Sequence, residues 1–514
     1  MIRKLLLGVS VAVISTALAI GPGMAQKSKD TLRISLSEQI PLLSAYHWPV
    51  AQAGQFYRRI YSGLMAFNEW NGKFVPNLAK SWRHINATTI EFDLREDVTF
   101  HTGNKFTADD VVHTVAYAGD PKLKLRFKSR YTWIKEIQKL SPYKIRVVAK
   151  KPAAAAMALL AFRILILDSK VHKSLAQKAD YGRLSASGTG PLKAVMVHRN
   201  KGIIVERFDG FKGNPKHFRA PIKRIVGIHL PDDQTKLAAL LTGDVDIVEG
   251  ISQENAKNIA ANPDLRITNK KSSNMVFFAI DAGNISGNKP LADVRVRRAI
   301  WMSMNRDQII KHIVPGGPAA EKMMALCFKS AKACKWTRDA APYDPAKAKK
   351  LLAEAGYPNG FEMKMLAINR IKDIGVAMAN EMLKIGIKVK VEPSNIGVYR
   401  RKQGRGELQS WIIAYPAGAF PDAGNHLNVF FRGSRTRYMD KDPIILKAMK
   451  LGAGEMNNEK RSNIYAKAYD RANEMIYNMA ITTLPYVYGH SKDVRVEHSQ
   501  LSTGEIHVSD HFFK

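Results

Sequence analysis

Two spacings of apolar residues alternate in the first third of the chain. Ile60, Leu64 and Phe67 recur at helical spacing, which predicts a helix over 56–66 with one apolar stripe against a core. The run 90–94 alternates apolar and polar residues instead, so it predicts a strand with one buried face. Helix and strand patterns therefore follow one another at short distance along the chain.

Capping residues mark where the predicted helices begin. Thr107 stands before Asp109 and Asp110, so its hydroxyl can accept a hydrogen bond from a free amide, and the two acids suit the positive end of a helix. We therefore expect a helix to begin near Thr107. Two more helices are bounded in the same way: 234–241 between Asp232 or Asp233 and Gly243, and a helix from Asp344 and Pro345 to Gly356.

Strands are predicted between these helices, over 192–197, 203–208 and 244–248. Helix and strand signals that alternate in this way indicate the α/β class. The 514 residues and 46% hydrophobic composition suffice for about two to four domains. We find no tandem repeat and no long linker, which favours domains built from interleaved segments.

The N-terminus has the features of an export signal. Arg3 and Lys4 precede an apolar stretch over 5–20, and small residues lead up to Ala25. We expect cleavage near Ala25 and release into the periplasm. An uncleaved membrane anchor is the alternative, but the stretch is short for a bilayer span.

A net charge of +34 distinguishes the composition, with 79 Lys and Arg against 45 acids. A polyanionic partner, an anionic membrane surface or an anionic ligand would each account for it, as would an ordinary solvated surface. The basic residues are spread along the whole chain and no nucleic-acid motif accompanies them, so no nucleic-acid partner is expected. We favour the solvated surface.

Cys327 and Cys334 are the only cysteines. In an oxidising compartment they favour a local disulfide that closes a short surface loop, with two free thiols as the alternative. No metal site is expected here, because the two cysteines have no nearby His or acidic ligands.

The order of several longer runs points to a known family. RRIYSGLMAFN, FVPNLAKSW and IEFDLREDVTFHTGNKFTADDVV lie within 57–112. GTGPLKAV, LPDDQTKLAALLTGDVDIV, DVRVRRAIWMSMNRDQII and YDPAKAKKLLAEAGYPNGF follow from positions 188, 230, 293 and 343. Together they resemble family 5 of the extracellular solute-binding proteins, the periplasmic peptide, opine and nickel receptors of ABC importers.

The resemblance implies a two-lobed periplasmic-binding-protein fold with an additional inserted domain, three domains in all, and a ligand cleft between the lobes. Carried onto this sequence, one lobe comprises 31–53, 188–269 and 490–514, the inserted domain 54–187, and the other lobe 270–489. Two crossings between the lobes follow from this division.

The family's cleft segment resembles 409–416, with Trp411 and Tyr415 as the aligned aromatic residues and Ile413 between them. Peptide receptors of the family carry an Asp at the position of Ala414, where it accepts the ligand's α-amino group. Without that carboxylate a protonated amine loses a charge-assisted bond of about 1.5–3 kcal/mol. An opine, a sugar conjugate or another anionic solute therefore competes with a peptide as the expected ligand.

Further candidates for ligand contact come from the same resemblance and from charge. Asp422 would replace the missing carboxylate if the loop before it folds back. Arg400, with Arg401 and Arg405, would offer a guanidinium fork to an anion, or else form a solvated basic loop. The remaining candidates are Tyr46, His47, Trp48 and Asn274, with Trp48 as a stacking face or a packing residue.

Catalysis is not expected. His101, Asp109 and Asp110 lie close together, but a turn and a helix start account for them, and neither a nucleophile elbow, a P-loop nor a zinc motif is present. We expect a monomeric, cofactor-free receptor that passes a small solute or peptide to an inner-membrane ABC permease. The alternative is a secreted basic protein with a lost or repurposed cleft that binds anionic polymers or surfaces.

Overall fold

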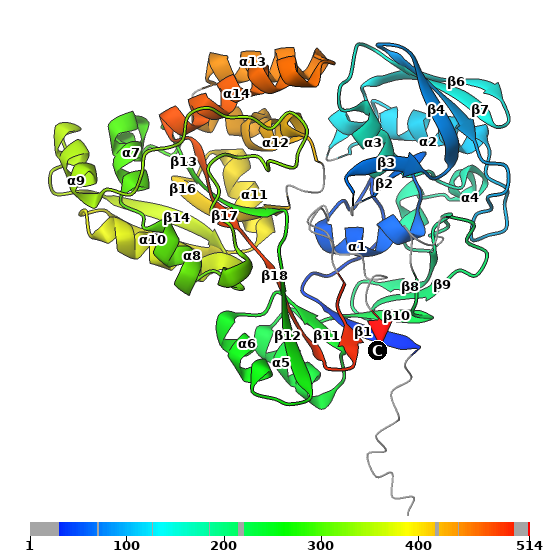
Figure 1. Ribbon diagram of the computed structural model, residues 1–514, viewed down its shortest axis with the longest axis horizontal. Helices are drawn as coiled ribbons and strands as arrows, with labels where there is room; N and C mark the ends of the chain where they lie inside the picture. The colour runs from blue at the N-terminus through cyan, green and yellow to red at the C-terminus, as the bar shows by residue number, and fades with distance from the viewer. Residues whose placement is uncertain are drawn as a thin grey trace, which may run out of the picture.

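The computed structural model describes residues 30–68, 71–125, 127–184, 186–213, 220–416, 421–439, 441–497 and 512–513. The signal peptide expected over 1–25 lies outside these ranges. Three larger β-sheets organise the described chain, with seven, five and four strands. Figure 1 shows the five-stranded sheet and its helices as one body, and the other two sheets together as a second body.

We call the second body the N-terminal lobe. Its seven-stranded sheet draws strands from both ends of the chain, and the parallel pairs β1·β10 and β1·β11 hold its centre. The sheet order is β12 (Leu265–Lys270), β18 (Tyr486–Ser491), β11 (Ile247–Glu249), β1 (Thr31–Leu36), β10 (Arg224–His229), β9 (Gly202–Arg207) and β8 (Leu192–His198).

The four-stranded sheet of the N-terminal lobe is antiparallel and comes from one continuous stretch of chain. Its order is β4 (Ala79–Asn86), β5 (Thr89–Leu94), β7 (Lys144–Ala149) and β6 (Ile134–Ser141). A hairpin of β2 (Met65–Asn68) and β3 (Lys73–Pro76) lies beside it. One hydrophobic cluster connects the two sheets of the lobe. It includes Leu32 from the seven-stranded sheet, and Phe92 and Val147 from the four-stranded sheet.

The C-terminal lobe is built on the five-stranded sheet. Its order is β15 (Lys388–Ser394), β14 (Glu362–Ile368), β16 (Ser410–Pro416), β13 (Asn274–Ile280) and β17 (Asn478–Thr483). Ile412 belongs to the hydrophobic cluster on one face of this sheet, whereas Trp411 and Ile413 belong to the cluster on the other face. β16 is therefore a central strand that is buried on both sides, which explains its continuous apolar sequence.

The helices cover these sheets. In the N-terminal lobe they are α1 (Ala51–Ile60), α2 (Ala108–Gly119), α3 (Ala156–Phe162), α4 (Ser169–Ser174), α5 (Asp233–Thr242) and α6 (Gln253–Ala260). In the C-terminal lobe they are α7 (Val294–Met302), α8 (Arg306–His312), α9 (Pro345–Glu354), α10 (Lys372–Leu383), α11 (Ile396–Arg405), α12 (Ala423–Phe431), α13 (Pro443–Gly454) and α14 (Asn458–Met475). Among the described residues, no helix is long and apolar enough to cross a membrane.

The chain crosses between the lobes twice, and the two crossings touch. One connects β12 to β13 and the other connects β17 to β18. The Ser272 hydroxyl donates to the Leu484 carbonyl oxygen (2.6 Å), and the Leu484 amide donates to the Asn274 carbonyl oxygen (2.9 Å). The boundary expected at 489/490 falls inside β18, because the chain has rejoined the seven-stranded sheet by Tyr486.

Most predicted helix starts and strands are confirmed. Thr107 forms a capping box with Asp110 at the start of α2, Asp232 caps α5, and Asp344 caps α9. Gly243 ends α5 in the left-handed conformation with a φ of 77°. The strand expected over 244–248 is shorter, since β11 begins only at residue 247.

The helix predicted over 56–66 is wrong in its second half. α1 ends at Ile60, and the chain then extends into the β2–β3 hairpin. Here the backbone passes close to α3, and Gly63 allows this because it has no side chain. A Cβ at this position would lie 2.7 Å from the Leu160 carbonyl oxygen. Packing against α3 thus overrides the helical spacing of the apolar residues.

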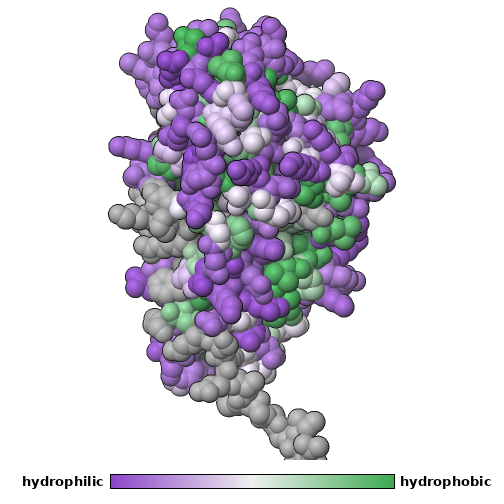
Figure 2. Space-filling model, turned by 90° about the vertical axis from the view of Figure 1, so that its right-hand side faces the viewer, coloured by the Kyte–Doolittle hydropathy of each residue, from purple (hydrophilic) through white to green (hydrophobic). Residues whose placement is uncertain are grey.

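Figure 2 shows the side of the molecule that the N-terminal lobe occupies in Figure 1. Hydrophilic residues cover most of this face, and apolar residues gather in a smaller area of its lower part. Most cationic side chains reach solvent, because the buried ones among the described residues are Arg59, Arg163, Lys236, Arg297, Arg306 and Arg461.

Candidate ligand-binding site between the lobes

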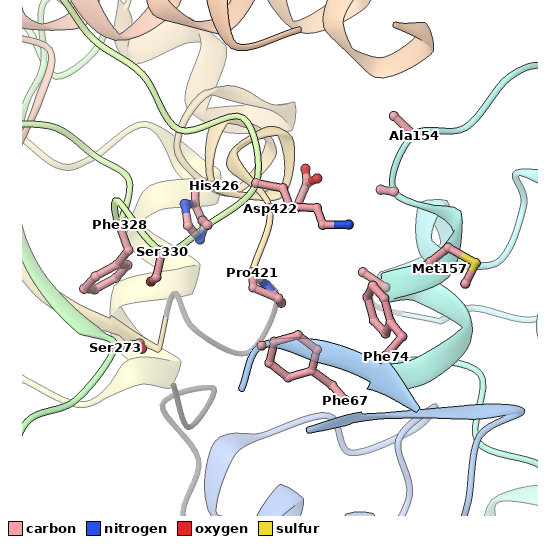
Figure 3. Close-up of a pocket in the computed structure, with 15 residues that line it drawn as sticks. Phe67, Phe74, Ala154, Met157, Ser273, Phe328, Ser330, Pro421, Asp422 and His426 are labelled. Carbon is pink, nitrogen blue, oxygen red and sulfur yellow. The ribbon is translucent and has the colours of Figure 1, made fainter. Parts of the chain in front are cut away.

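A pocket lies where the two lobes face each other. Phe67, Phe74 and Met157 line it from β2, β3 and α3 of the N-terminal lobe, while Phe328 and His426 line it from the C-terminal lobe (Figure 3). Its volume is about 800 Å³, including the part open to solvent. A concave space with aromatic walls and a few polar groups is typical of sites that bind small organic ligands.

The wall from the N-terminal lobe is apolar. The Phe67 ring packs against Phe74 and Phe162, with centroid distances of 5.5 and 5.3 Å. Ala154, Ala155 and Ala158 complete this side. Because alanine side chains are short, they leave space in front of the aromatic rings.

The wall from the C-terminal lobe contains a buried ion pair. The Asp422 carboxylate caps α12 by accepting from the Gly424 amide (2.9 Å), and it accepts two hydrogen bonds from Arg461 (2.6 and 2.8 Å). Burial alone would lower the pKa of Arg461, but the hydrogen bonds and charge of Asp422 outweigh burial and raise it. The negative charge of Asp422 is therefore already balanced inside the protein.

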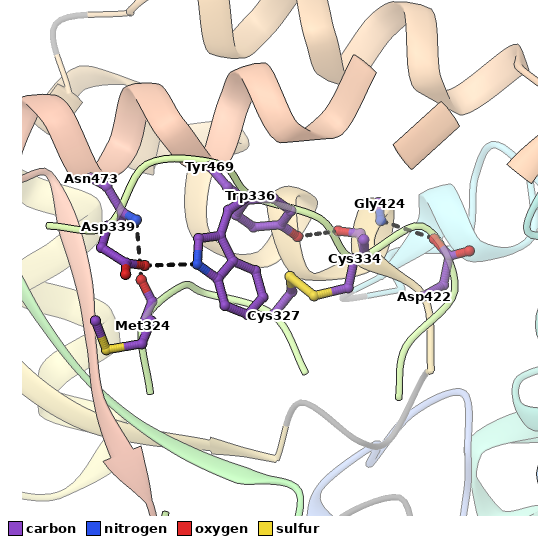
Figure 4. Close-up of a disulfide and its surroundings, with 10 residues drawn as sticks. Met324, Cys327, Cys334, Trp336, Asp339, Asp422, Gly424, Tyr469 and Asn473 are labelled. Atoms are coloured by element: carbon purple, nitrogen blue, oxygen red, sulfur yellow. Dashed lines mark hydrogen bonds between the residues drawn. A yellow bond between two sulfur atoms is a disulfide. The ribbon is translucent and has the colours of Figure 1, made fainter. Parts of the chain in front are cut away.

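A disulfide joins Cys327 to Cys334 and closes the loop that forms the rest of this wall (Figure 4). Cys327 is only 2% exposed and belongs to a hydrophobic cluster of the C-terminal lobe. Lys329, Ser330 and Lys332 are exposed, as expected of a surface loop, but the bond that closes the loop reaches the core at Cys327. Beyond the loop, the Thr337 amide and hydroxyl donate to Asp470 (2.7 and 2.6 Å) and the Asn473 side chain donates to the Arg338 carbonyl oxygen (2.7 Å), which hold the chain after Cys334 against α14.

The aromatic residue that the sequence placed first in the cleft is part of the core. Trp411 is 2% exposed and packs between Tyr399 and Tyr438, with centroid distances of 6.4 and 5.0 Å. Ile413 is buried on the same face of β16. Neither lines the pocket, because β16 is a central strand with helices over both faces.

Tyr415 and its neighbours lie near the end of β16. The Tyr415 ring packs edge-on against Phe430 (5.6 Å), and its hydroxyl accepts from the Asn425 side chain (3.4 Å). Ala414 pairs with Val276 of β13, so the position of the missing carboxylate lies inside the sheet. Asn274, on β13, is 3% exposed. The residues 417–420 that follow β16 lie outside the described part of the chain.

Tyr46, His47 and Trp48 lie in the N-terminal lobe and pack there. The buried Tyr46 hydroxyl donates to the Leu165 carbonyl oxygen (2.7 Å), and a ring nitrogen of His47 lies 2.7 Å from the Tyr117 hydroxyl. Trp48 packs against the main hydrophobic cluster of that lobe. Of the nine candidate ligand contacts, only Asp422 lines the pocket.

Arg400 lies elsewhere on the boundary between the lobes. It and Arg370 are exposed, yet surrounding protein lowers the pKa of each guanidinium, while the charge of Glu38 in the N-terminal lobe acts in the opposite direction. Two guanidiniums facing one carboxylate leave a local excess of positive charge on this stretch of the boundary.

The residues considered for catalysis have structural roles. The Gly188 amide donates to His101 Nδ1 (3.2 Å) and His101 Nε2 donates to the Gly190 carbonyl oxygen (2.9 Å). Burial lowers the pKa of His101 to about 4, so the ring is neutral at pH 7. Asp110 serves the capping box, and Asp109 pairs with Lys139 on the surface (2.7 Å).

Two histidines that are distant in sequence meet in the N-terminal lobe. His113 Nε2 and His172 Nδ1 are 2.9 Å apart, and Tyr117 packs against His172 with a centroid distance of 4.4 Å. Burial lowers the pKa of His172 to about 4. Within the described ranges, no group of three or more His, Cys, Asp or Glu residues is arranged to hold a metal ion.

The sequence pattern of the bacterial extracellular solute-binding proteins, family 5 (middle region) matches residues 73–438. The chain belongs to this family. Heme-binding protein A of Haemophilus influenzae is 26% identical over 465 residues, which cover 82% of this chain and 80% of the relative. The dipeptide-binding protein of Escherichia coli K12 is 27% identical over 391 residues, covering 69% of this chain and 70% of the relative.

Solved structures agree with the two-lobed fold of this family 5 protein. DppA from Helicobacter pylori in complex with the peptide STSA superposes with a TM-score of 0.78 at 22% identity, covering 94% of this chain and 98% of that one. NikA from Brucella suis in complex with Fe(III)-EDTA gives a TM-score of 0.81 at 18% identity, covering 94% and 100%. The predicted fold class, an α/β protein with two lobes, is confirmed.

Sequence reasoning missed the residues that form most of the pocket. The loop 328–332 and the alanines before α3 carry no motif, and they meet only through the arrangement of the lobes. The sequence did contain one sign that Trp411 and Ile413 are buried in a sheet rather than exposed in a cleft. The unbroken apolar run at 411–414 is typical of a central strand covered on both faces.

Proposed function

We propose that this family 5 protein captures a small organic solute in the pocket between its lobes and delivers it to an ABC permease. The observation that carries the proposal is that both lobes supply walls of one pocket: Phe67 and Phe74 on one side, Phe328 and Asp422 on the other. A ligand in that position touches both lobes at once, so it stabilises the arrangement in which they face each other.

The cellular setting follows from the expected export signal. The mature chain, beginning after Ala25, acts in the periplasm as a monomer, and its ligand-bound form docks on a permease of the inner membrane. The inserted domain of 54–187 supplies one pocket wall through the β2–β3 hairpin and α3. No step of this cycle needs covalent chemistry.

The ligand class is an organic solute with an apolar part. Relatives and structural neighbours bind dipeptides, glutathione, heme or agropinic acid, which differ in shape but share carboxylates beside an organic body. The three phenylalanines of the pocket suit that body. The carboxylate of Asp422 is occupied by Arg461, which disfavours recognition of an amine through Asp422.

Thermal unfolding of the mature protein against solutes of these classes, at low and high salt, tests the proposal. We expect one class to raise the midpoint by mass action and to do so in both salts. Phe74→Ala should weaken that ligand about tenfold through loss of an aromatic face. Tyr343→Ala is the matched control, because Tyr343 is 46% exposed and does not line the pocket.

Two outcomes would contradict the proposal. A ligand whose affinity Phe74→Ala leaves unchanged binds somewhere else. Binding only of anionic polymers, lost steeply as salt rises, would instead favour the secreted basic protein that the +34 charge also allows.

A further inference from the structure

The loop closed by the disulfide supplies a disproportionate part of the pocket wall. Four pocket residues come from the six between the cysteines: Phe328, Ser330, Ala331 and Lys332. Figure 4 shows the S–S bond at the base of this loop. A short loop closed by a covalent bond has few conformations, so it presents the same side chains to the pocket in each molecule.

The backbone of Lys332 is fixed on the far side of the loop as well. Its amide donates to the Pro421 carbonyl oxygen (3.0 Å), and its carbonyl oxygen accepts from the Ala423 amide (2.9 Å). The Tyr469 hydroxyl donates to the Ala423 carbonyl oxygen (2.9 Å), which ties the same segment to α14. Lys332 is thus held between the disulfide and the N-terminus of α12.

Unlike its backbone, the side chain of Lys332 is not fixed by hydrogen bonds within the described part of the chain. It is exposed, and its ammonium lies 5.4 Å from the centroid of the Phe74 ring, across the gap between the lobes. Within the described part of the chain, no ion pair engages this ammonium, while the nearby Asp422 is fully engaged by Arg461. The pocket therefore presents a positive charge beside an aromatic face.

We propose that Lys332 determines specificity by binding an anionic group of the ligand, whose apolar body lies against Phe74 and Phe67. This inference rests on the proposed function, since it takes the pocket as the ligand site. A carboxylate or phosphate would receive a charge-assisted hydrogen bond from the ammonium. The aromatic rings would meanwhile exclude water from one side, which strengthens that bond.

A matched set of fragments tests the assignment without knowledge of the natural ligand. 4-Phenylbutyrate carries an anion on an apolar body, and 4-phenylbutanamide has the same body without charge. We would measure both dissociation constants by ligand-observed NMR on the mature protein and on three variants, Lys332→Gln, Lys332→Arg and Lys329→Gln. Lys329 is the control because it lies in the same loop, is exposed and stacks on Trp336 (5.8 Å) outside the pocket.

We expect the wild-type protein to prefer the carboxylate about tenfold or more, as a charge-assisted bond implies. Lys332→Gln should abolish that preference, whereas Lys332→Arg and Lys329→Gln should keep it. Equal binding of the two fragments by the wild type, absence of binding of both, or a preference that survives in Lys332→Gln would each overturn the inference. If Phe74→Ala still weakens the natural solute in any of these cases, only the role of Lys332 fails and the proposed function stands.

Discussion

Glu249 of the N-terminal lobe and Asp422 of the C-terminal lobe are both buried, but different kinds of partner hold their carboxyl groups. In the C-terminal lobe, Asp422 pairs with Arg461, and the 2%-exposed Asp442 side chain pairs with Arg471 (2.8 Å). The N-terminal lobe also contains a buried acid held by cations, since Glu91 pairs with Arg83 and Arg146 (2.6 and 2.9 Å), but its Glu249 and His172 have neutral hydrogen-bond partners. Glu249 accepts from the Gln55 amide (3.1 Å), and His172 contacts His113.

The buried Glu249 and His172 should make the stability of the N-terminal lobe depend on pH. Burial raises the pKa of Glu249 to about 7, while hydrogen bonding by Gln55 and the charge of Lys236 offset part of that rise. Burial lowers the pKa of His172 to about 4. Both groups titrate between about pH 4 and about pH 7, so the stability of the N-terminal lobe should depend on pH over this range.

The largest effect should come from breaking the pair beside the pocket. Arg461→Met leaves the Asp422 carboxylate buried without its cation, which should cost about 3–5 kcal/mol in the free energy of unfolding. Urea unfolding followed by circular dichroism measures it. A loss below about 1 kcal/mol would mean that the C-terminal lobe does not depend on its buried pair.

The second-largest effect should be a pH dependence of the free energy of unfolding that comes from Glu249 of the N-terminal lobe. Because the folded-state pKa of Glu249 lies above its ordinary value of 4.5, its protonation stabilises the fold below about pH 4.5, and this stabilisation is lost as pH rises through 7. Glu249→Gln removes that dependence, so its stability relative to the wild type should rise by up to about 3 kcal/mol between pH 4.5 and 8. Unfolding free energies at the two pH values measure it, and a constant difference would show that Glu249 titrates normally.

A smaller effect should come from removing the disulfide of the C-terminal lobe. Replacing both Cys327 and Cys334 by serine frees a short loop, which should cost about 2–3 kcal/mol by loop-closure entropy. It should also reduce the preference for 4-phenylbutyrate, since Lys332 is no longer held in one place. The wild-type protein under reducing conditions serves as the comparison; an unchanged midpoint and unchanged preference would show that the backbone bonds of Lys332 suffice.

The smallest effect should come from the exposed pair between Asp109 and Lys139, whose nitrogen–oxygen distance of 2.7 Å is close to that of the buried pair. Lys139→Gln should change the unfolding free energy by less than about 1 kcal/mol, because water solvates both charges. Urea unfolding of this variant beside Arg461→Met is the check. Similar losses in both would show that distance, rather than burial, sets the strength of these pairs.

Local signals in the sequence predicted local structure well. The acids and hydroxyls that start α2, α5 and α9 act within three residues of themselves, so one sequence contains all the information needed. The prediction for α1 failed where contact with α3 decides the conformation. The family, and with it the two-lobed fold, followed from motifs spread over the chain.

The site depended on contacts that no local pattern records. Phe74 and Lys332 come from opposite lobes, and Asp422 meets its arginine only because α12 and α14 pack together. Trp411 was assigned to the cleft by alignment with a motif, but the helices on both faces of β16 enclose it. The family position of a residue therefore indicates its strand more reliably than its exposure.

The paired crossings between the lobes also constrain how this chain can change in length. Three residues separate β12 from β13 and two separate β17 from β18, and hydrogen bonds hold these connectors side by side. An insertion in one connector alone would shift it against the other and strain the sheets at both ends. A change in the length of one connector therefore requires a matching change in the other. A reporter domain should be inserted into a surface loop elsewhere.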